Sequence, residues 1–377
     1  MKQSVRLGRI GGIPVGAHWS VAIILVIITE LLATTVLPAA LGHQHPVLYW
    51  MVGAVAAVLF LASLAAHELA HALVARRNGV GVKSVTLWML GGVTELEGDP
   101  PGPGADLRIA LAGPAASLAA AAVFLGAGVA IGAAGGPAIA VGAATWLAVM
   151  NAVLAAFNLL PGAPLDGGRV LRAVLWRHYA DRRRAQQAAA RSGRFLGMVI
   201  VGIGIAEFLI LRSIGGLWLI LIGWFLISAA AAEERTTAAT AALSGVRIAD
   251  VMTPQPDLAP GWNTVAEFAE WAAAWSRQES FPVIGFDGAL IGVVLARQLA
   301  GLPAGDRATL RLDQLALPVP PEYRAAPDDP ASALLGRRPI GGEVLAVVLA
   351  DGKVTGLVTV ADLQQAVRWR ALAGTRS

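Results

Sequence analysis

The sequence predicts an α-helical membrane protein that crosses the bilayer several times and ends in a smaller α/β domain. Only 14% of its 377 residues are charged, whereas a soluble domain usually carries about 25%. Uncharged runs account for the difference, because residues 47–66 hold 20 positions without a charge, enough to cross a hydrocarbon core of about 30 Å. Beyond residue 246 no such run occurs, and short β-like segments alternate with amphipathic helical ones.

Six segments of the first 233 residues have the length and composition of membrane helices. They cover residues 17–38, 48–77, 106–131, 137–160, 194–212 and 215–233. The first resembles a secretory signal peptide, because Lys2, Arg6 and Arg9 precede it. It is longer than a usual apolar signal region and shows no convincing cleavage site, so we expect a retained membrane anchor.

Basic residues are distributed unevenly among the connections between these helices, and this predicts the orientation of the chain. They gather before the first helix and in the second and fourth connections, at Lys2, Arg6, Arg9, Arg76, Arg77, Lys83, Arg108, Arg169, Arg172, Arg177, Arg182, Arg183, Arg184, Arg191 and Arg194. The alternate connections hold only Arg212. We therefore expect a multi-pass cell-membrane protein with both termini and the C-terminal domain in the cytoplasm. The net charge of +4 is mild and lies beside apolar runs, which argues against a nucleic-acid partner.

A His-Glu-x-x-His pattern ends the second predicted helix. His67 and His71 are four residues apart, so both imidazoles lie on one helix face and can reach one metal ion. Glu68 is placed to take a proton from a water molecule on that metal. The alternative is a group of polar residues at the membrane interface. Because each charge in an apolar helix costs about 2.5–3.5 kcal/mol, the metal site is favoured.

A third ligand is required, because catalytic zinc sites usually have three protein ligands. The sequence contains no cysteine, so this ligand must be His, Asp or Glu. Asp166 is the candidate, since it follows an apolar helix in a segment interrupted by Pro161 and Pro164. Gly167 and Gly168 allow the backbone to approach closely there. The alternative is an ordinary turn aspartate at a helix end.

The two motifs together resemble the site-2 protease family of intramembrane zinc metalloproteases. The resemblance covers about residues 1–233. The second motif of the family, Asn-x-x-Pro-x-x-x-Leu-Asp-Gly, is matched at every position, by Asn158, Pro161, Leu165, Asp166 and Gly167.

This resemblance implies one catalytic zinc ion, Zn²⁺, with His67, His71 and Asp166 as its ligands. It also implies that Glu68 is the general base. Asn158 would help to hold the scissile carbonyl or its oxyanion.

Residues 82–98 have the alternating pattern of a β-hairpin, with Gly91 and Gly92 as its turn. A protease must unwind a membrane helix locally before it can cut it, and an exposed strand edge can hold the opened chain. Site-2 proteases have a hairpin of this kind here, which implies that Leu90, Gly91, Gly92 and Val93 clamp the substrate. The alternative is an ordinary interfacial hairpin.

Other polar or small residues are interpreted structurally. Gly113 and Ser117 lie in "LAGPAAS", which resembles another signature of the family and suits close helix packing. We expect His18, next to a Trp, to be an interfacial anchor. Glu30 and Glu207 are expected at solvated helix ends, although either could line a polar gate.

The change in composition after residue 233 predicts three regions. A transmembrane protease domain covers residues 1–233, a linker 234–246 and an α/β domain 247–377. The last contains an internal duplication, with copies at about 247–305 and 312–370.

These copies resemble a pair of cystathionine-β-synthase-type (CBS) domains, which often bind adenine nucleotides. Thr359 and Asp362 match the ribose-binding pattern of that family, whereas "GVVLARQL" in the first copy departs from it. The resemblance implies at most one well-formed site, for ATP or AMP. The alternative is a purely structural module that forms a homodimer.

The sequence therefore predicts a zinc endopeptidase in the lipid bilayer that cuts single-pass transmembrane substrates. The resemblance implies substrates such as anti-sigma factors or membrane-tethered transcription factors, with regulation by nucleotide. One alternative is a CBS-regulated channel or transporter, which leaves the position of Glu68 between two histidines unexplained. Another is an inactive protease-like chaperone, which would have no need of Glu68.

Overall fold

The computed structural model describes residues 4–41, 44–89 and 91–373 and divides into two compact units, residues 1–234 and 235–377. The boundary falls inside a helix, α8 (Gly215–Ala242). The predicted linker, residues 234–246, is thus helical as far as Ala242.

The prediction of six membrane helices is confirmed within the described residues. The first span, Val21–Ala40, comprises α1 (Val21–Leu31), a π-helical turn (Leu32–Val36) and most of α2 (Leu37–Leu41). The others are α3 (Pro46–Arg77), α4 (Pro103–Ala133), α5 (Ala138–Asn158), α7 (Arg182–Ile210) and α8. Helix α7 begins at Arg182 rather than 194, because its polar first turns continue the same helix and Asp181 caps it.

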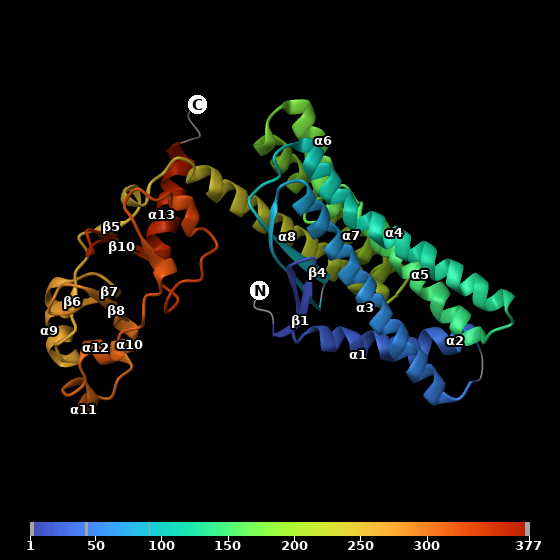
Figure 1. The fold of residues 1–377 in the computed structure, drawn as a ribbon, viewed down its shortest axis with the longest axis horizontal. Helices are drawn as coiled ribbons and strands as arrows, with labels where there is room; N and C mark the ends of the chain where they lie inside the picture. The colour runs from blue at the N-terminus through green and yellow to red at the C-terminus, as the bar shows by residue number, and fades with distance from the viewer. Residues whose placement is uncertain (1–3, 42–43, 90, 374–377) are drawn as a thin grey trace. The chain divides into compact units, whose positions relative to one another are not determined.

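These helices pack closely where small residues face each other. In Figure 1, α3, α4 and α5 lie side by side in the first unit. Between α7 and α8, a Cβ at Gly197 would lie 2.9 Å from the Gly223 oxygen, and a Cβ at Gly216 would lie 2.4 Å from the Gly204 oxygen. Glycine is therefore needed where these two backbones touch, as is common between membrane helices.

A further helix, α6 (Asp166–Tyr179), was not predicted. It is amphipathic and too short to span a bilayer, so hydropathy alone does not reveal it. It ends at Ala180, which has a left-handed backbone with φ of 52°.

The predicted hairpin is present, but it belongs to a larger sheet. The sheet has the order β1 (Val5–Ile10), β2 (Ile13–Ala17), β3 (Gly81–Trp88), β4 (Gly91–Glu97). Strand β2 runs parallel to β3, and the other two pairs are antiparallel. Ile13, Val15 and Val85 pack against Ala72 of α3, so the sheet is fixed to the helix that carries the histidine pair. Strand β4 is an edge strand.

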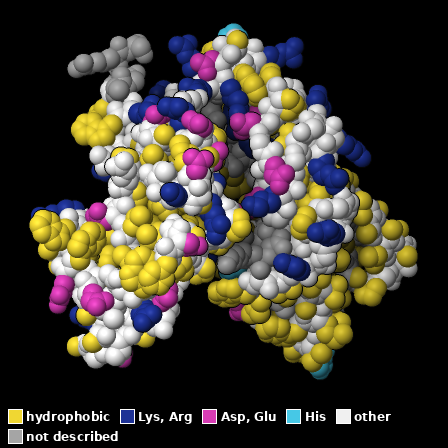
Figure 2. Space-filling model, turned by 60° about the vertical axis from the view of Figure 1, so that its left-hand side comes forward, with side chains coloured by type: hydrophobic (Ala, Val, Ile, Leu, Met, Phe, Trp, Pro, Cys, Tyr) yellow, Lys and Arg dark blue, Asp and Glu magenta, His cyan; other side chains and the backbone are white. Residues whose placement is uncertain are grey.

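Side chains on the outside of the helical unit match a lipid environment. Figure 2 shows hydrophobic side chains over one end of this unit and Lys and Arg side chains gathered toward the other. Large apolar side chains are exposed on several spans, among them Val123, Leu209 and Trp218. Such exposure is unfavourable in water and favourable against lipid tails.

The second unit contains two similar arrangements of strands. In each, an antiparallel hairpin is joined by a short parallel strand and followed by a helix. The first has β6 (Ala259–Pro260), β7 (Ser280–Ile284), β8 (Leu290–Leu295) and α10 (Ala296–Ala300); the second has β9 (Arg324–Ala325), β10 (Val344–Ala350), β11 (Lys353–Thr359) and α13 (Val360–Ala373).

The two copies also share a sheet. Strand β5 (Thr253–Pro254) belongs to the first copy in sequence but pairs with β11 of the second. Ile248 and Val251 likewise join the apolar core around β10 and β11. The remaining helices are α9 (Val265–Trp275), α11 (Ala304–Arg307), α12 (Leu312–Leu315) and the 3₁₀ turns Ile248–Asp250, Pro321–Tyr323 and Ala331–Leu334.

Candidate metal centre and catalytic site

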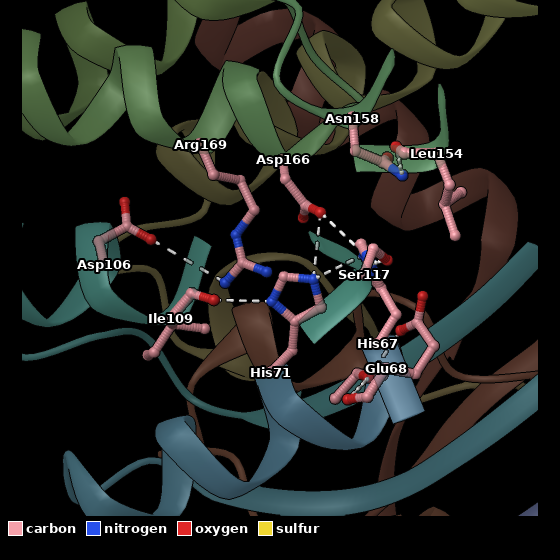
Figure 3. A network of polar contacts seen from close by, with 11 residues as sticks. His67, Glu68, His71, Asp106, Ile109, Ser117, Leu154, Asn158, Asp166 and Arg169 are labelled. Atoms are coloured by element: carbon pink, nitrogen blue, oxygen red, sulfur yellow. Dashed lines mark hydrogen bonds and ion pairs between the residues drawn. The ribbon is translucent and has the colours of Figure 1, made fainter. Parts of the chain in front are cut away.

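The three predicted ligands come together (Figure 3). Asp166 Oδ2 lies 3.1 Å from His67 Nε2 and 3.1 Å from His71 Nε2, and the two nitrogens are 3.2 Å apart. Tetrahedral zinc ligands with bonds of about 2.0–2.1 Å are separated by roughly 3.3 Å. Both imidazoles are buried, with 2% and 4% exposure. Two nitrogens and one carboxylate oxygen at this spacing fit a zinc ion.

Helix α4 orients both imidazoles. The Nδ1–H of His71 donates to the Ile109 carbonyl oxygen at 2.7 Å, which leaves Nε2 free to bind a metal. His67 Nδ1 lies 2.8 Å from the Ser117 hydroxyl oxygen, and Ser117 is fully buried. Ser117 therefore does more than the predicted helix packing, because it also holds a ligand ring.

Gly113 makes room for the metal centre. A Cβ at this position would lie 2.2 Å from His71 Nε2 and 2.4 Å from His67 Nε2. The interpretation of Gly113 as a helix-packing residue was thus incomplete. It lies between Ile109 and Ser117 at intervals of four residues, so all three face the histidines from one side of α4.

Strand β4 contacts the predicted base. Thr94 Oγ1 donates to Glu68 Oε2 at 2.8 Å. A Cβ at Gly92 would lie 2.2 Å from Glu68 Cγ, so the strand passes directly over this side chain. Sequence reasoning missed Thr94, although an alternating strand beside the catalytic helix was a signal for it.

The predicted turn at Gly91 and Gly92 is wrong, because both residues already belong to β4 and pair with Trp88 and Leu87. Leu90, assigned to the same clamp, lies outside the described residues. Val93 is exposed on β4 and pairs with Thr86. The clamping role of this segment stays a prediction.

Asp166 is placed by the tight start of α6. A Cβ at Gly167 would lie 2.3 Å from the carbonyl oxygens of Leu159 and Leu160. A Cβ at Gly168 would lie 2.3 Å from the Ala163 nitrogen. The Asp-Gly-Gly sequence is therefore needed for α6 to begin against this loop. Although burial raises the pKa of Asp166, the hydrogen bonds and charges of the two histidines together lower that pKa to about 2.

A buried ion pair ties α6 to α4. Arg172 Nε and Nη2 donate to the two carboxylate oxygens of Asp106 at 2.8 and 2.7 Å. Arg169 Nη2 lies 3.9 Å from the same carboxylate (Figure 3). Arg169 and Arg172 were interpreted only as topology signals, yet they are partners of an acidic residue inside the protein.

The described contacts of Asn158 are local. Its side-chain nitrogen donates to the Leu154 carbonyl oxygen at 3.0 Å, within α5 (Figure 3). Its role in holding a substrate carbonyl therefore stays a prediction. Asn151, one heptad earlier, is fully buried and donates to the Leu147 carbonyl oxygen at 2.9 Å, while its Oδ1 atom accepts no hydrogen bond from any described residue.

In the C-terminal unit, the two predicted nucleotide-site residues contact each other. The backbone nitrogen and the hydroxyl of Thr359 both donate to Asp362 Oδ2 at 2.8 Å. Both residues line a cavity of about 450 Å³ that Arg277 and Glu343 also line.

Comparison with known proteins finds a matching family and relatives. Residues 55–140 and 131–200 match the family model of peptidase family M50. Rip3 of Mycobacterium tuberculosis, which carries the name of a zinc metalloprotease, is 46% identical over 368 residues, covering 97% of this chain and 93% of that protein.

Two solved structures are similar to separate parts of the chain. The site-2 protease from Methanocaldococcus jannaschii is 29% identical, with a TM-score of 0.42, over 61% of this chain and 94% of that one. The CBS domain of a bacterial CNNM/CorC family Mg²⁺ transporter in complex with ATP is 20% identical, with a TM-score of 0.31, over 36% of this chain and 96% of that one.

The fold and the site define a multi-pass membrane metalloprotease. Similarity to a zinc metalloprotease over nearly the whole chain shows more: the chain belongs to peptidase family M50, the site-2 proteases. The predictions of a zinc metalloendopeptidase and of six membrane helices within the described residues are confirmed.

Proposed function

We propose that this intramembrane zinc protease cuts single-pass membrane proteins of the anti-sigma-factor or membrane-tethered transcription-factor type and so releases a cytoplasmic fragment. The convergence of His67, His71 and Asp166, with Glu68 held next to them under an edge strand, carries the proposal. A channel or transporter would not require this convergence.

Different residues of the chain bind the metal, orient its ligands and transfer the proton. His67, His71 and Asp166 would hold the zinc ion, which when bound supplies a Lewis acid for peptide hydrolysis. Ile109 and Ser117 keep the imidazoles in position. Glu68 takes the proton of the attacking water and then gives it to the leaving amine. Thr94 occupies one oxygen of Glu68, which leaves the other available for that proton.

Strand β4 gives the substrate a place to bind. A peptide bond inside a membrane helix has its N–H and C=O groups in helical hydrogen bonds, so the helix must open before cleavage. The unpaired edge of β4 can accept the opened segment by strand addition. Because Thr94 and Gly92 of this strand touch Glu68, a chain added there would lie next to the catalytic group.

The predicted orientation, with both termini in the cytoplasm, is part of the proposal. Arg169 and Arg172 support this orientation less than the sequence suggested, because both interact with Asp106 inside the protein. Basic residues that remain at the surface, such as Arg183 and Arg184, still support it.

The experiment compares wild-type protein with Glu68→Gln in lipid vesicles that contain a single-pass substrate. Cleavage should be lost in the variant while the zinc content stays at the wild-type value, because Glu68 is not a ligand. Cleavage that persists in Glu68→Gln would exclude this residue as the base. Ion transport or substrate holding as the sole activity of the wild type would exclude the enzyme.

We also propose that ATP or AMP binds the C-terminal cavity, with the ribose at Asp362, and that the CBS pairs of two chains associate as a homodimer. The Thr359–Asp362 pair in a cavity of this size supports the nucleotide. Titration calorimetry on the full chain should detect binding that Asp362→Ala weakens at least about 10-fold. Equal heats from both proteins, or none from either, would leave only the dimerisation module.

A further inference from the structure

A cavity of about 330 Å³ lies next to the catalytic centre in the N-terminal unit. Thr94 and Leu96 of β4 line it, as does Leu165, the residue before Asp166. Helices α6, α7 and α8 close the other sides, and among the described lining residues none belongs to β3. The cavity therefore borders the edge strand β4 without contacting any described residue of β3.

The geometry of strand addition directs substrate side chains into this cavity. Side chains of a strand alternate between two faces, and directly opposite residues of paired strands point to the same face. Thr94 and Leu96, two residues apart, face the cavity. A substrate residue paired opposite one of them would direct its side chain into the same space.

Arg169 is the arginine of this cavity that makes no hydrogen bond to any described residue, although Arg182 Nε also has no partner there. Three arginines line the cavity, but Arg172 is bound by Asp106 and Arg182 by Asp99. Within the described residues, Arg169 has only the 3.9 Å ion pair to Asp106 and makes no hydrogen bond.

Arg169 is accessible from the cavity and lies among both basic and acidic groups. Its side chain is 26% exposed, so it is accessible from the cavity. Burial and the neighbouring Arg172 lower the pKa of Arg169, whereas Asp106, Asp166 and Glu233 raise it. Glu233 and Asp99 also line the cavity, and Asp99 is bound by Arg182. The side-chain amide of Gln186, on α7, also lines the cavity without a hydrogen bond to any described residue.

We propose that this cavity is a subsite for an acidic side chain of the substrate, whose carboxylate binds Arg169 and Gln186. Arginine presents several N–H donors to one carboxylate in a fixed geometry, and the amide adds another donor. Arg169 is then a residue that determines specificity. This inference rests on the proposed function, because strand addition to β4 brings the side chain into place.

The test uses zinc-loaded full-length protein in lipid vesicles. The probe is a synthetic single-pass helix of leucine and alanine with a central Gly-Pro pair. At each position on either side of that pair, three versions of the helix, called hosts, carry Asp, Asn or Lys. We expect that at one position Asp raises kcat/KM about 10-fold over Asn, as a charged hydrogen bond allows, and that Lys lowers it. Equal cleavage of all three hosts at every position would overturn the subsite.

Variants assign the preference to Arg169. Arg169→Gln should abolish it, Arg169→Lys should keep part of it, and Arg169→Glu should reverse it in favour of Lys. Arg194→Gln, the same change at a half-exposed arginine of α7 that pairs with Glu234 and lies outside the cavity, should keep it unchanged. Zinc content identifies any variant that has lost its fold. A preference for Asp that survives in folded Arg169→Gln would refute the assignment.

A binding measurement separates this inference from the proposed function. Glu68→Gln protein is titrated with fluorescent Asp and Lys hosts, and anisotropy reports their affinities. If the wild type cuts no host but the Asp host binds about 10-fold more tightly, the subsite stands and cleavage of this host is refuted. If the hosts are cut but neither rate nor affinity depends on charge, only the subsite fails. Absence of both cleavage and binding refutes both.

Discussion

The buried ion pair between α4 and α6 should be essential for zinc binding, although neither of its residues touches the metal ligands. Asp106 is fully buried and the Arg172 side chain is 10% exposed. Helix α4 also carries Ile109, which holds His71, and α6 begins with Asp166. The pair therefore joins the two elements whose separation decides whether Asp166 reaches the histidines.

Arg172→Gln removes the cation and leaves the Asp106 carboxylate buried, with Arg169 at 3.9 Å as its remaining partner. Removing one member of a buried pair costs about 3–5 kcal/mol of folding free energy. Because Arg169 still interacts with the Asp106 carboxylate, we expect a loss of about 3 kcal/mol. The double variant Asp106→Asn, Arg172→Gln removes both charges and should recover most of this. In the single variant, zinc affinity should fall about 10–100-fold.

The assay is chelator competition for zinc, together with denaturant unfolding of the detergent-solubilised protein. The control is Asp99→Asn, which breaks an ion pair whose aspartate is 69% exposed and should cost at most about 1 kcal/mol. If Arg172→Gln retains zinc as well as the control does, or if the double variant is no more stable than the single one, the reasoning is refuted.

Three further changes test the site. Gly113→Ala places a Cβ 2.2 Å from a ligand nitrogen, so zinc binding should be lost. Gly126→Ala lies in the same helix, and outside its own stretch of helix no described residue comes within 4 Å of the added Cβ, so this variant should bind zinc normally in a zinc-content assay. Gly92→Ala forces a Cβ against the Glu68 side chain. We expect the cleavage rate to fall at least about 100-fold, as for a displaced general base, while zinc stays bound. An unchanged rate would show that β4 can move away. Ser117→Ala removes the hydrogen bond to a ligand imidazole and should weaken zinc about 10-fold in chelator competition, while equal affinity would assign Ser117 to packing alone.

Much of the helical unit could be predicted because membrane insertion depends on local composition. A run of apolar residues is stable across a bilayer whatever its neighbours are, so the six spans follow from hydropathy. Their ends do not, since a helix continues into water wherever its residues favour it, as α7 does at Arg182. The amphipathic helix α6 has no such signal and is held by contacts with α4 and α7.

The first sheet, in contrast, could be predicted only in part. Residues 82–98 alternate clearly, and the hairpin was predicted, but β1 and β2 were missed. Short strands such as Ile13–Ala17 are stabilised by a neighbour distant in sequence, here β3. Pairing of that kind cannot be read from local propensity.

The sequence by itself indicated the metal chemistry, because His67 and His71 share a helix face, the absence of cysteine restricted the third ligand to His, Asp or Glu, and the family resemblance implied Asp166. It also determined the number of membrane helices, which depends on local hydropathy. Only the tertiary structure decided that Ile109, Gly113 and Ser117 of α4 support the ligand rings. It alone placed Thr94 on Glu68 and put Arg169, which makes no hydrogen bond to any described residue, in a cavity that β4 also lines. The physical reason is that these contacts join segments far apart in the chain, and their distances depend on how the helices pack.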